Sequence, residues 1–247
     1  MMPFSLTDRA TVLERITAIA RSDSRVTGGA SVGSGSTDSM DAWSDIDVTF
    51  GLKSGTDLVL VLKEWTRLLE NEFGMVHYFD VPSGSAIYRV ILFPNCLELD
   101  LSVVPENDYG ARSPDFRLLF GKAVERTSFP EQSIESLIGF GWHHVLHANS
   151  AIERGRNWQA EFWISAARDN ILALRCIRFG EVGAQARGVH RLPVAEVALL
   201  ESTLVRSIEI PELRRALKAV ASALIDEICH KDAELAERLE RSLMGIV

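Results

Sequence analysis

The sequence predicts an α+β fold in which a small mixed-sheet module is followed by an all-helical bundle. Before Pro105, short runs of alternating apolar and polar residues, the period of strands, are interspersed with two runs of helical spacing. From about residue 131 onward, helical periodicity continues almost to the end, punctuated by Gly and Pro. We therefore expect two domains, residues 1–126 and 127–247.

The first domain is expected to begin with a helix whose apolar residues recur at intervals of three and four. Ser5 and Thr7 are its candidate caps, and Gly74 is expected to end the second helix. In chain order we expect a helix at 7–20, strands at 25–32 and 45–52, a helix at 56–73, and strands at 75–81, 86–93, 96–104 and 116–120.

The second domain is expected to contain helices only. Their predicted ranges are residues 132–155, 158–180, 193–207 and 211–244. The segment at 183–193 has scattered Gly, Arg and His with little periodicity, so we expect an exposed loop there.

Composition and charge narrow the class of protein. The chain carries 26 Lys and Arg against 34 Asp and Glu, a net charge of −8, which argues against a nucleic-acid-binding surface and suits a cationic small substrate. The three cysteines are widely spaced, as in a reduced, cytoplasmic protein. No signal peptide or membrane span is expected, so we predict no membrane partner.

Acidic residues at positions i and i+2 mark the predicted strand at 45–52. Side chains alternate along a strand, so Asp45 and Asp47 share one face while the apolar residues take the other. In the strand at 96–104, Glu98 and Asp100 share a face in the same way. Like charges gathered on one face repel, and a divalent cation relieves that repulsion. The pattern therefore predicts a metal site.

These residues resemble a known family. Ser-Val-Gly-Ser at 31–34, then ten residues, then Asp-Ile-Asp-Val at 45–48 resembles the signature of the DNA polymerase β-like nucleotidyltransferase superfamily, and Asp100 matches its third carboxylate. The helical half, with Trp163 and residues 168–175, resembles the substrate-binding region of small bacterial aminoglycoside and lincosamide nucleotidyltransferases. The resemblance implies a nucleotidyltransferase catalytic domain followed by a helical acceptor-binding domain.

The resemblance also implies roles for single residues. Gly33 and Ser34 would bind the β- and γ-phosphates through a backbone turn. Asp45 and Asp47 would hold Mg²⁺, and Asp100 would ligate a metal or take the proton of the acceptor hydroxyl. Glu98 is the alternative base.

Several residues of the second domain are candidates for binding a substrate. Arginine binds phosphates well, so Arg168 and Arg187 are predicted to contact the nucleotide, with an ordinary surface position as the alternative. The same alternatives apply to Arg175 and Arg191, and to Asp169 and Glu161 as ligands for an amino group.

Aromatic and imidazole side chains cluster in the predicted helices of the second domain. His143 and His147 have the i, i+4 spacing of a zinc pair, but no neighbouring acid completes the metalloprotease pattern, so a packing role is favoured. Trp158, Phe162 and Trp163 are expected to pack the bundle, with stacking on a substrate as the alternative.

The predicted function is Mg²⁺-dependent transfer of a nucleoside monophosphate, AMP from ATP, to a hydroxyl of a small molecule. An aminoglycoside or lincosamide acceptor would make this an antibiotic-resistance enzyme. The alternatives are a protein or other acceptor and a non-catalytic nucleotide-binding module. We expect no nucleic-acid partner, and a homodimer is left open.

Overall fold

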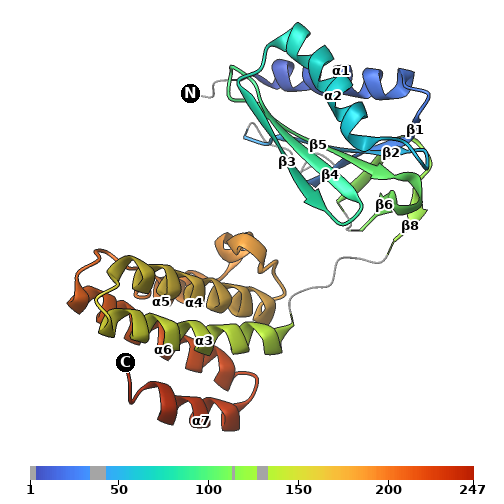
Figure 1. Ribbon diagram of the computed structural model, residues 1–247. Coiled ribbons are helices and arrows are strands. Elements are labelled where there is room, and N and C mark those ends of the chain that lie inside the picture. The colour runs from blue at the N-terminus through green and yellow to red at the C-terminus, as the bar shows by residue number, and fades with distance from the viewer. Residues whose placement is uncertain (1–3, 34–42, 113–114, 127–132) are drawn as a thin grey trace. The chain divides into compact units, whose positions relative to one another are not determined.

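The computed structural model describes residues 4–33, 43–112, 115–126 and 133–247. The chain divides into two compact units, Met1–Pro130 and Glu131–Val247, and each has its own hydrophobic core (Figure 1). The first unit combines helices with a mixed sheet and the second is helical, so the predicted α+β class is confirmed.

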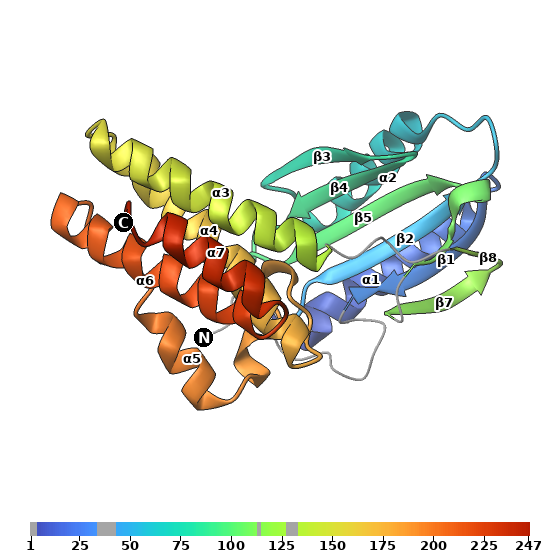
Figure 2. The same cartoon turned by 90° about the horizontal axis from the view of Figure 1, so that it is seen from below.

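Six strands of the first unit form one sheet in the order β3-β4-β5-β2-β1-β7, as Figure 2 shows. Only β2 and β5 run parallel among these pairs, and the other neighbours are antiparallel. The elements are α1 (Leu6–Ser22), β1 (Val26–Val32), β2 (Ile46–Leu52), α2 (Leu58–Phe73), β3 (His77–Ser83), β4 (Ala86–Leu92), β5 (Glu98–Pro105), β6 (Gly110–Ala111), β7 (Phe116–Gly121) and β8 (Val124–Glu125). The pair β6–β8 was not predicted, because two-residue strands carry no periodicity.

Side chains define the ends of both helices in this unit. The backbone N–H of Asp8 donates to Ser5 Oγ at 3.1 Å and that of Ser5 donates to Asp8 Oδ2 at 2.8 Å, a capping box that begins α1. Asp57 accepts from the N–H of Leu60 at 3.1 Å and begins α2. Gly74, with φ +71°, ends α2 as predicted.

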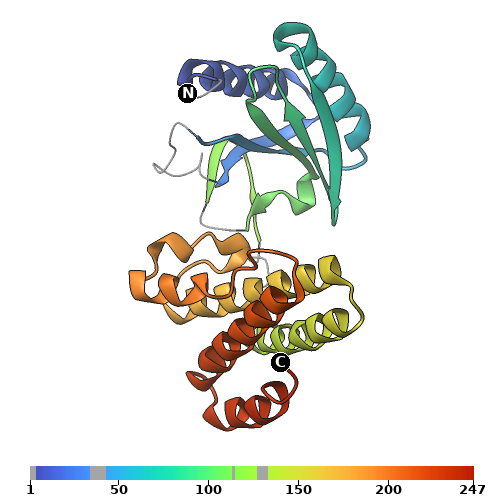
Figure 3. The same cartoon turned by 90° about the vertical axis from the view of Figure 1, so that its left-hand side faces the viewer.

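Helices α1 and α2 lie on the same side of the sheet (Figures 1 and 3), and the core of the unit lies beneath them. Val48 and Phe50 of β2 and Leu101 of β5 point into this core with Ile16 of α1 and Trp65 of α2. The rings of Phe50 and Trp65 meet edge to face with centroids 5.4 Å apart. Burial of each such side chain stabilises the fold by about 1.5–3 kcal/mol. Because side chains alternate along a strand, the burial of these residues also fixes which side chains of β2 and β5 lie on the opposite face.

The second unit contains α3 (Ile134–Glu153), α4 (Asn157–Arg178), α5 (Val194–Glu201), α6 (Ile210–Cys229) and α7 (Ala233–Leu243). Short 3₁₀ turns at Ala184–Ala186 and Val189–Arg191 occupy the predicted loop. None of the helices that the structure describes is long and apolar enough to cross a membrane.

Two predicted helices differ from the structure. The helix predicted at 211–244 is wrong as one element, because Asp232 accepts from the N–H of Leu235 at 2.9 Å and caps a new helix, α7. The helix predicted at 193–207 ends early, at Glu201. Beyond this point Arg215 of α6 donates to the backbone carbonyls of Ser202 (2.6 Å) and Leu204 (2.7 Å). These carbonyls therefore have hydrogen-bond partners without a further turn of helix.

A buried ion-pair network joins α4, α5 and α6. Arg175, only 1% exposed, donates to the Glu227 carboxylate and to the backbone carbonyl of Glu196 at 2.9 Å. Arg178 donates to Glu227 at 3.1 Å and to the Glu196 carboxylate at 2.9 Å. Arg175 is therefore committed to the packing of the bundle, which replaces the prediction that it contacts phosphate.

Removing Glu227 should destabilise the helical unit strongly. Glu227→Ala leaves the Arg175 guanidinium buried without its main counter-charge, and breaking a buried pair in this way costs about 3–5 kcal/mol. We expect this loss in the free energy of unfolding, measured by urea titration followed by circular dichroism.

Glu153→Ala is the matched control, because it breaks the exposed Arg214–Glu153 pair, whose N–O distance is 2.7 Å. Exposed pairs contribute about 0–1 kcal/mol. Equal losses in the two variants would contradict a structural role for the buried network.

Candidate functional site

The parallel pairing of β2 with β5 brings the predicted acids together. Asp47 is the register partner of Asp100, and Ile46 is the partner of Leu99. Because Leu99 and Leu101 are fully buried toward α1 and α2, alternation directs Asp47 and Asp100 to the opposite face. We call this side of the sheet the acid face.

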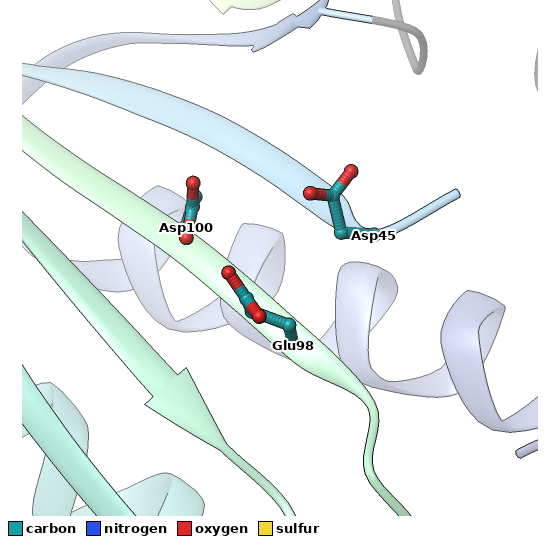
Figure 4. Close-up of side chains that lie close together, drawn as sticks. All are labelled: Asp45, Glu98 and Asp100. Atoms are coloured by element: carbon teal, nitrogen blue, oxygen red, sulfur yellow. The ribbon is translucent and has the colours of Figure 1, made fainter. Parts of the chain in front are cut away.

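Three carboxylates meet on the acid face, at the start of the two strands (Figure 4). One oxygen from each of Asp45, Glu98 and Asp100 lies within 4.8 Å of the others. Asp45 and Asp100 are half-buried and Glu98 is exposed. The structure thus brings together two of the three predicted ligands and adds Glu98, which the sequence offered only as an alternative base.

The electrostatics of this trio centre on Asp100. Burial, followed by the negative charges of Glu98 and Asp45, raises the pKa of Asp100 from its ordinary value of 3.8 to about 6. Its Oδ1 atom is buried and has no hydrogen-bond partner among the residues that the structure describes.

A divalent cation fits this set of donors. All three side chains offer carboxylate oxygens, the hard ligands that Mg²⁺ prefers, and a cation would offset their mutual repulsion. It would also supply a partner for the buried Oδ1 of Asp100.

Asp47 lies beside the trio and faces the end of β1. A Cβ placed on Gly33 would lie 2.6 Å from Asp47 Oδ2, and Gly33 has φ +60°. Both the backbone conformation and the close carboxylate therefore require glycine at this position. Ser34, predicted to bind phosphate, lies outside the described residues.

The predicted nucleotide-binding arginines lie in the helical unit. Arg168 donates to Ser165 Oγ at 3.0 Å, and that hydroxyl donates to Glu161 at 2.6 Å. Arg187 is exposed and directly follows the turn at Ala184–Ala186. Asp169 lines a separate cavity of about 410 Å³ in this unit. The roles of these side chains stay predictions.

The three histidines of α3 form a ring cluster with Trp163 of α4. The rings of His143 and His147 are 4.4 Å apart, and Trp163 lies 5.1 Å from His144 and 4.9 Å from His147. Asn170 Nδ2 lies 3.2 Å from His144 Nδ1, and burial lowers the pKa of His144. His144 and Trp163 are partly buried, whereas His143 and His147 are exposed, and the packing role of the histidines stays a prediction.

Neither a family model nor a curated protein matches the sequence. Among solved structures, the chain is similar to an aminoglycoside 6-adenyltransferase from Bacillus subtilis, with 16% identity and a TM-score of 0.39 over 95% of this chain and 97% of the other. It is also similar to the GLD-2/RNP-8 complex, with 13% identity, a TM-score of 0.34 and coverage of 90% and 78%. A CdnE cyclic dinucleotide synthase from Elizabethkingia meningoseptica, solved with GTP and Apcpp, has 13% identity, a TM-score of 0.30 and coverage of 90% and 78%. TM-scores of this size indicate only a broad likeness of shape.

The raised pKa of Asp100 predicts a pH-dependent gain in stability on neutralising it. In EDTA no metal offsets the charge of Asp100. The folded protein then loses stability as the pH rises from 3.8, the ordinary pKa of the carboxyl, to about 6, its pKa in the folded state. Below pH 3.8 the carboxyl is protonated in both the folded and the unfolded state and this loss is absent. We expect Asp100→Asn to raise the melting temperature at pH 7.5 and to leave it nearly unchanged at pH 4.

The control is Glu234→Gln, which neutralises a carboxylate whose side chain is 82% exposed. It breaks only an exposed pair with Arg238, which contributes about 0–1 kcal/mol, so both melting temperatures should change little. A wild-type protein as stable as Asp100→Asn at pH 7.5 would contradict the raised pKa of Asp100.

Proposed function

We propose that this protein is a Mg²⁺-dependent nucleotidyltransferase that moves a nucleoside monophosphate, most simply AMP from ATP, to a hydroxyl of a small molecule. The observation that carries the proposal is the carboxylate trio of Asp45, Glu98 and Asp100, in which the buried Oδ1 of Asp100 has no hydrogen-bond partner within the described part of the chain. The resemblance of residues 31–48 to nucleotidyltransferases supports it.

In this proposal the trio holds the cation, with Asp47 as a further ligand beside Asp100. When bound, Mg²⁺ would neutralise charge on the phosphates and lower the pKa of the acceptor hydroxyl. Gly33, together with Ser34, would bind the β- and γ-phosphates through backbone N–H groups. Arg168 and Arg187 are the candidates for further phosphate contacts.

The reaction forms a bond between the acceptor oxygen and the α-phosphorus. The bond from that phosphorus to the oxygen bridging to the β-phosphate breaks, and pyrophosphate leaves. The hydroxyl proton passes to a carboxylate. Asp100 and Glu98 are the two candidate bases on the acid face. A carboxylate that ligates the cation is a poor base, so metal binding is the first role that we propose for Asp100 and proton transfer is the second.

We propose a small-molecule acceptor selected by the helical unit. The net charge of −8 suits a cationic aminoglycoside, and a lincosamide is the second candidate from the resemblance. Modification of either would confer antibiotic resistance. Free Cys96, Cys176 and Cys229 are in keeping with a cytoplasmic protein.

Loss of a metal-binding acid should abolish transfer. We expect Asp45→Asn and Asp47→Asn each to lower the rate of pyrophosphate release from Mg-ATP by more than about 100-fold. Loss of a residue that only hydrogen-bonds to a metal ligand already lowers metal affinity or activity by about 10–100-fold. The assay uses the four nucleoside triphosphates against a panel of aminoglycosides and lincosamides.

Asp57→Asn is the matched control, because asparagine caps a helix as well as aspartate does and Asp57 only caps α2. It should retain full activity. A variant at Asp45 or Asp47 that keeps a large share of the activity would contradict the metal-ligand assignment. Labelled nucleotide on a protein band would indicate a protein acceptor, and metal-dependent nucleotide binding without pyrophosphate release would indicate a non-catalytic module.

A further inference from the structure

A cavity of about 350 Å³ opens on the acid face, further along the same strands that carry the acids. Its size lies near the lower end of the range of about 300–1,000 Å³ for small-molecule sites. Thr49 of β2, Ser102 of β5 and Tyr88 of β4 contribute to its wall.

These three hydroxyl side chains form one row across the sheet. Ser102 is the register partner of both Thr49 and Tyr88. The neighbouring row contains Asp47 and Asp100, two residues earlier in β2 and β5. Two residues of strand span about 7 Å, so a molecule in the cavity would lie about that far from Asp47 and Asp100.

The hydroxyls on the floor are held by the sheet. Thr49 is only 9% exposed and Ser102 only 3%. Ser102 Oγ donates to the carbonyl of Val48 at 3.4 Å, a long hydrogen bond that leaves its lone pairs available as acceptors. Both residues line the cavity, and a hydroxyl both donates and accepts, so this floor can hydrogen-bond to a polar ligand.

The walls come from segments far apart in the chain. Tyr109 and Phe116 line one side, with ring centroids 5.9 Å apart. The turn between β3 and β4 lines another side, and its Ser85 hydrogen-bonds to Asp108. Phe116 and the largely buried ring of Tyr109 add apolar surface to the lining.

The described lining of the cavity carries one acid and one base, Asp108 and Arg112. Asp108 pairs at 2.8 Å with Arg126, which is not part of the lining, and also feels the positive charge of Arg112. Among the described lining residues, no further acid is available to an ammonium group. The cavity therefore suits a neutral part of a substrate and not the cationic part.

We infer that this cavity binds a neutral, hydroxyl-bearing ring, that is, the sugar portion of one of the two substrates. Hydroxyls both donate and accept, so a sugar matches the floor, and its C–H face matches the aromatic walls. The sugar can be the ribose of the nucleotide or a ring of the acceptor. This inference rests on the proposed nucleotidyl transfer and assigns a place for its substrate.

Two substitutions test the cavity. Thr49→Val removes one hydroxyl at constant shape and should weaken binding about 2–10-fold, the effect of one hydrogen bond. Ser102→Leu fills the cavity and should weaken binding more than tenfold. Thr27→Val in β1 is the matched control, because its hydroxyl is buried on the same sheet without a partner and does not line the cavity.

Binding of Mg-ATP and of Mg-2′-deoxyATP and Mg-3′-deoxyATP is measured by calorimetry, and binding of each panel antibiotic by thermal shift. If the ribose occupies the cavity, Thr49→Val and Ser102→Leu weaken the binding of Mg-ATP. At least one deoxy analogue, which lacks a ribose hydroxyl, then loses less binding affinity in these variants than ATP does. If the acceptor occupies the cavity, both variants bind Mg-ATP as the wild type does. An antibiotic that raises the melting temperature of the wild type then no longer raises that of the variants.

The inference is overturned if every compound that binds the wild type binds both variants as tightly as it binds Thr27→Val. A wild-type protein that binds no Mg-nucleotide would instead contradict the proposed function, and the cavity assignment with it. The two failures are therefore distinguishable.

Discussion

The parallel pairing of β2 and β5 is the constraint on which the candidate site depends. On one side of these strands, Phe50, Leu99 and Leu101 are buried beneath α1 and α2, and this burial fixes the register. Several side chains at about 1.5–3 kcal/mol each hold the pairing against the repulsion among the acids on the other side. A slip of one residue would turn Asp47 or Asp100 into the core.

The same alternation places the hydroxyl row. Thr49 and Ser102 follow Asp47 and Asp100 at i+2, so acids and hydroxyls lie on one continuous surface. Along these two strands, carboxylates therefore come first and hydroxyls follow. Such a division suits a substrate with a reacting phosphate at one end and a neutral ring at the other, and Gly33 keeps the space beside Asp47 open.

The sequence predicts the parts of this arrangement that depend on local pattern. Alternation and spacing place Asp45 and Asp100 on strands, but the closeness of Glu98 depends on strand pairing and emerges only in three dimensions. Apolar periodicity runs across the break at Asp232 and hides it. The burial of Arg175 depends on Glu227, 52 residues later in the chain. The cavity has no sequence signal, because its walls come from separated segments.

The most direct test of the account is the position of a divalent cation. A crystal grown with Mn²⁺ and a non-hydrolysable ATP analogue, measured at the manganese absorption edge, would locate the metal by anomalous scattering. We predict a peak within bonding distance of Asp45 and Asp100, next to the α-phosphate. A fully occupied nucleotide with no metal at these carboxylates, or with metal bound only elsewhere, would contradict the account.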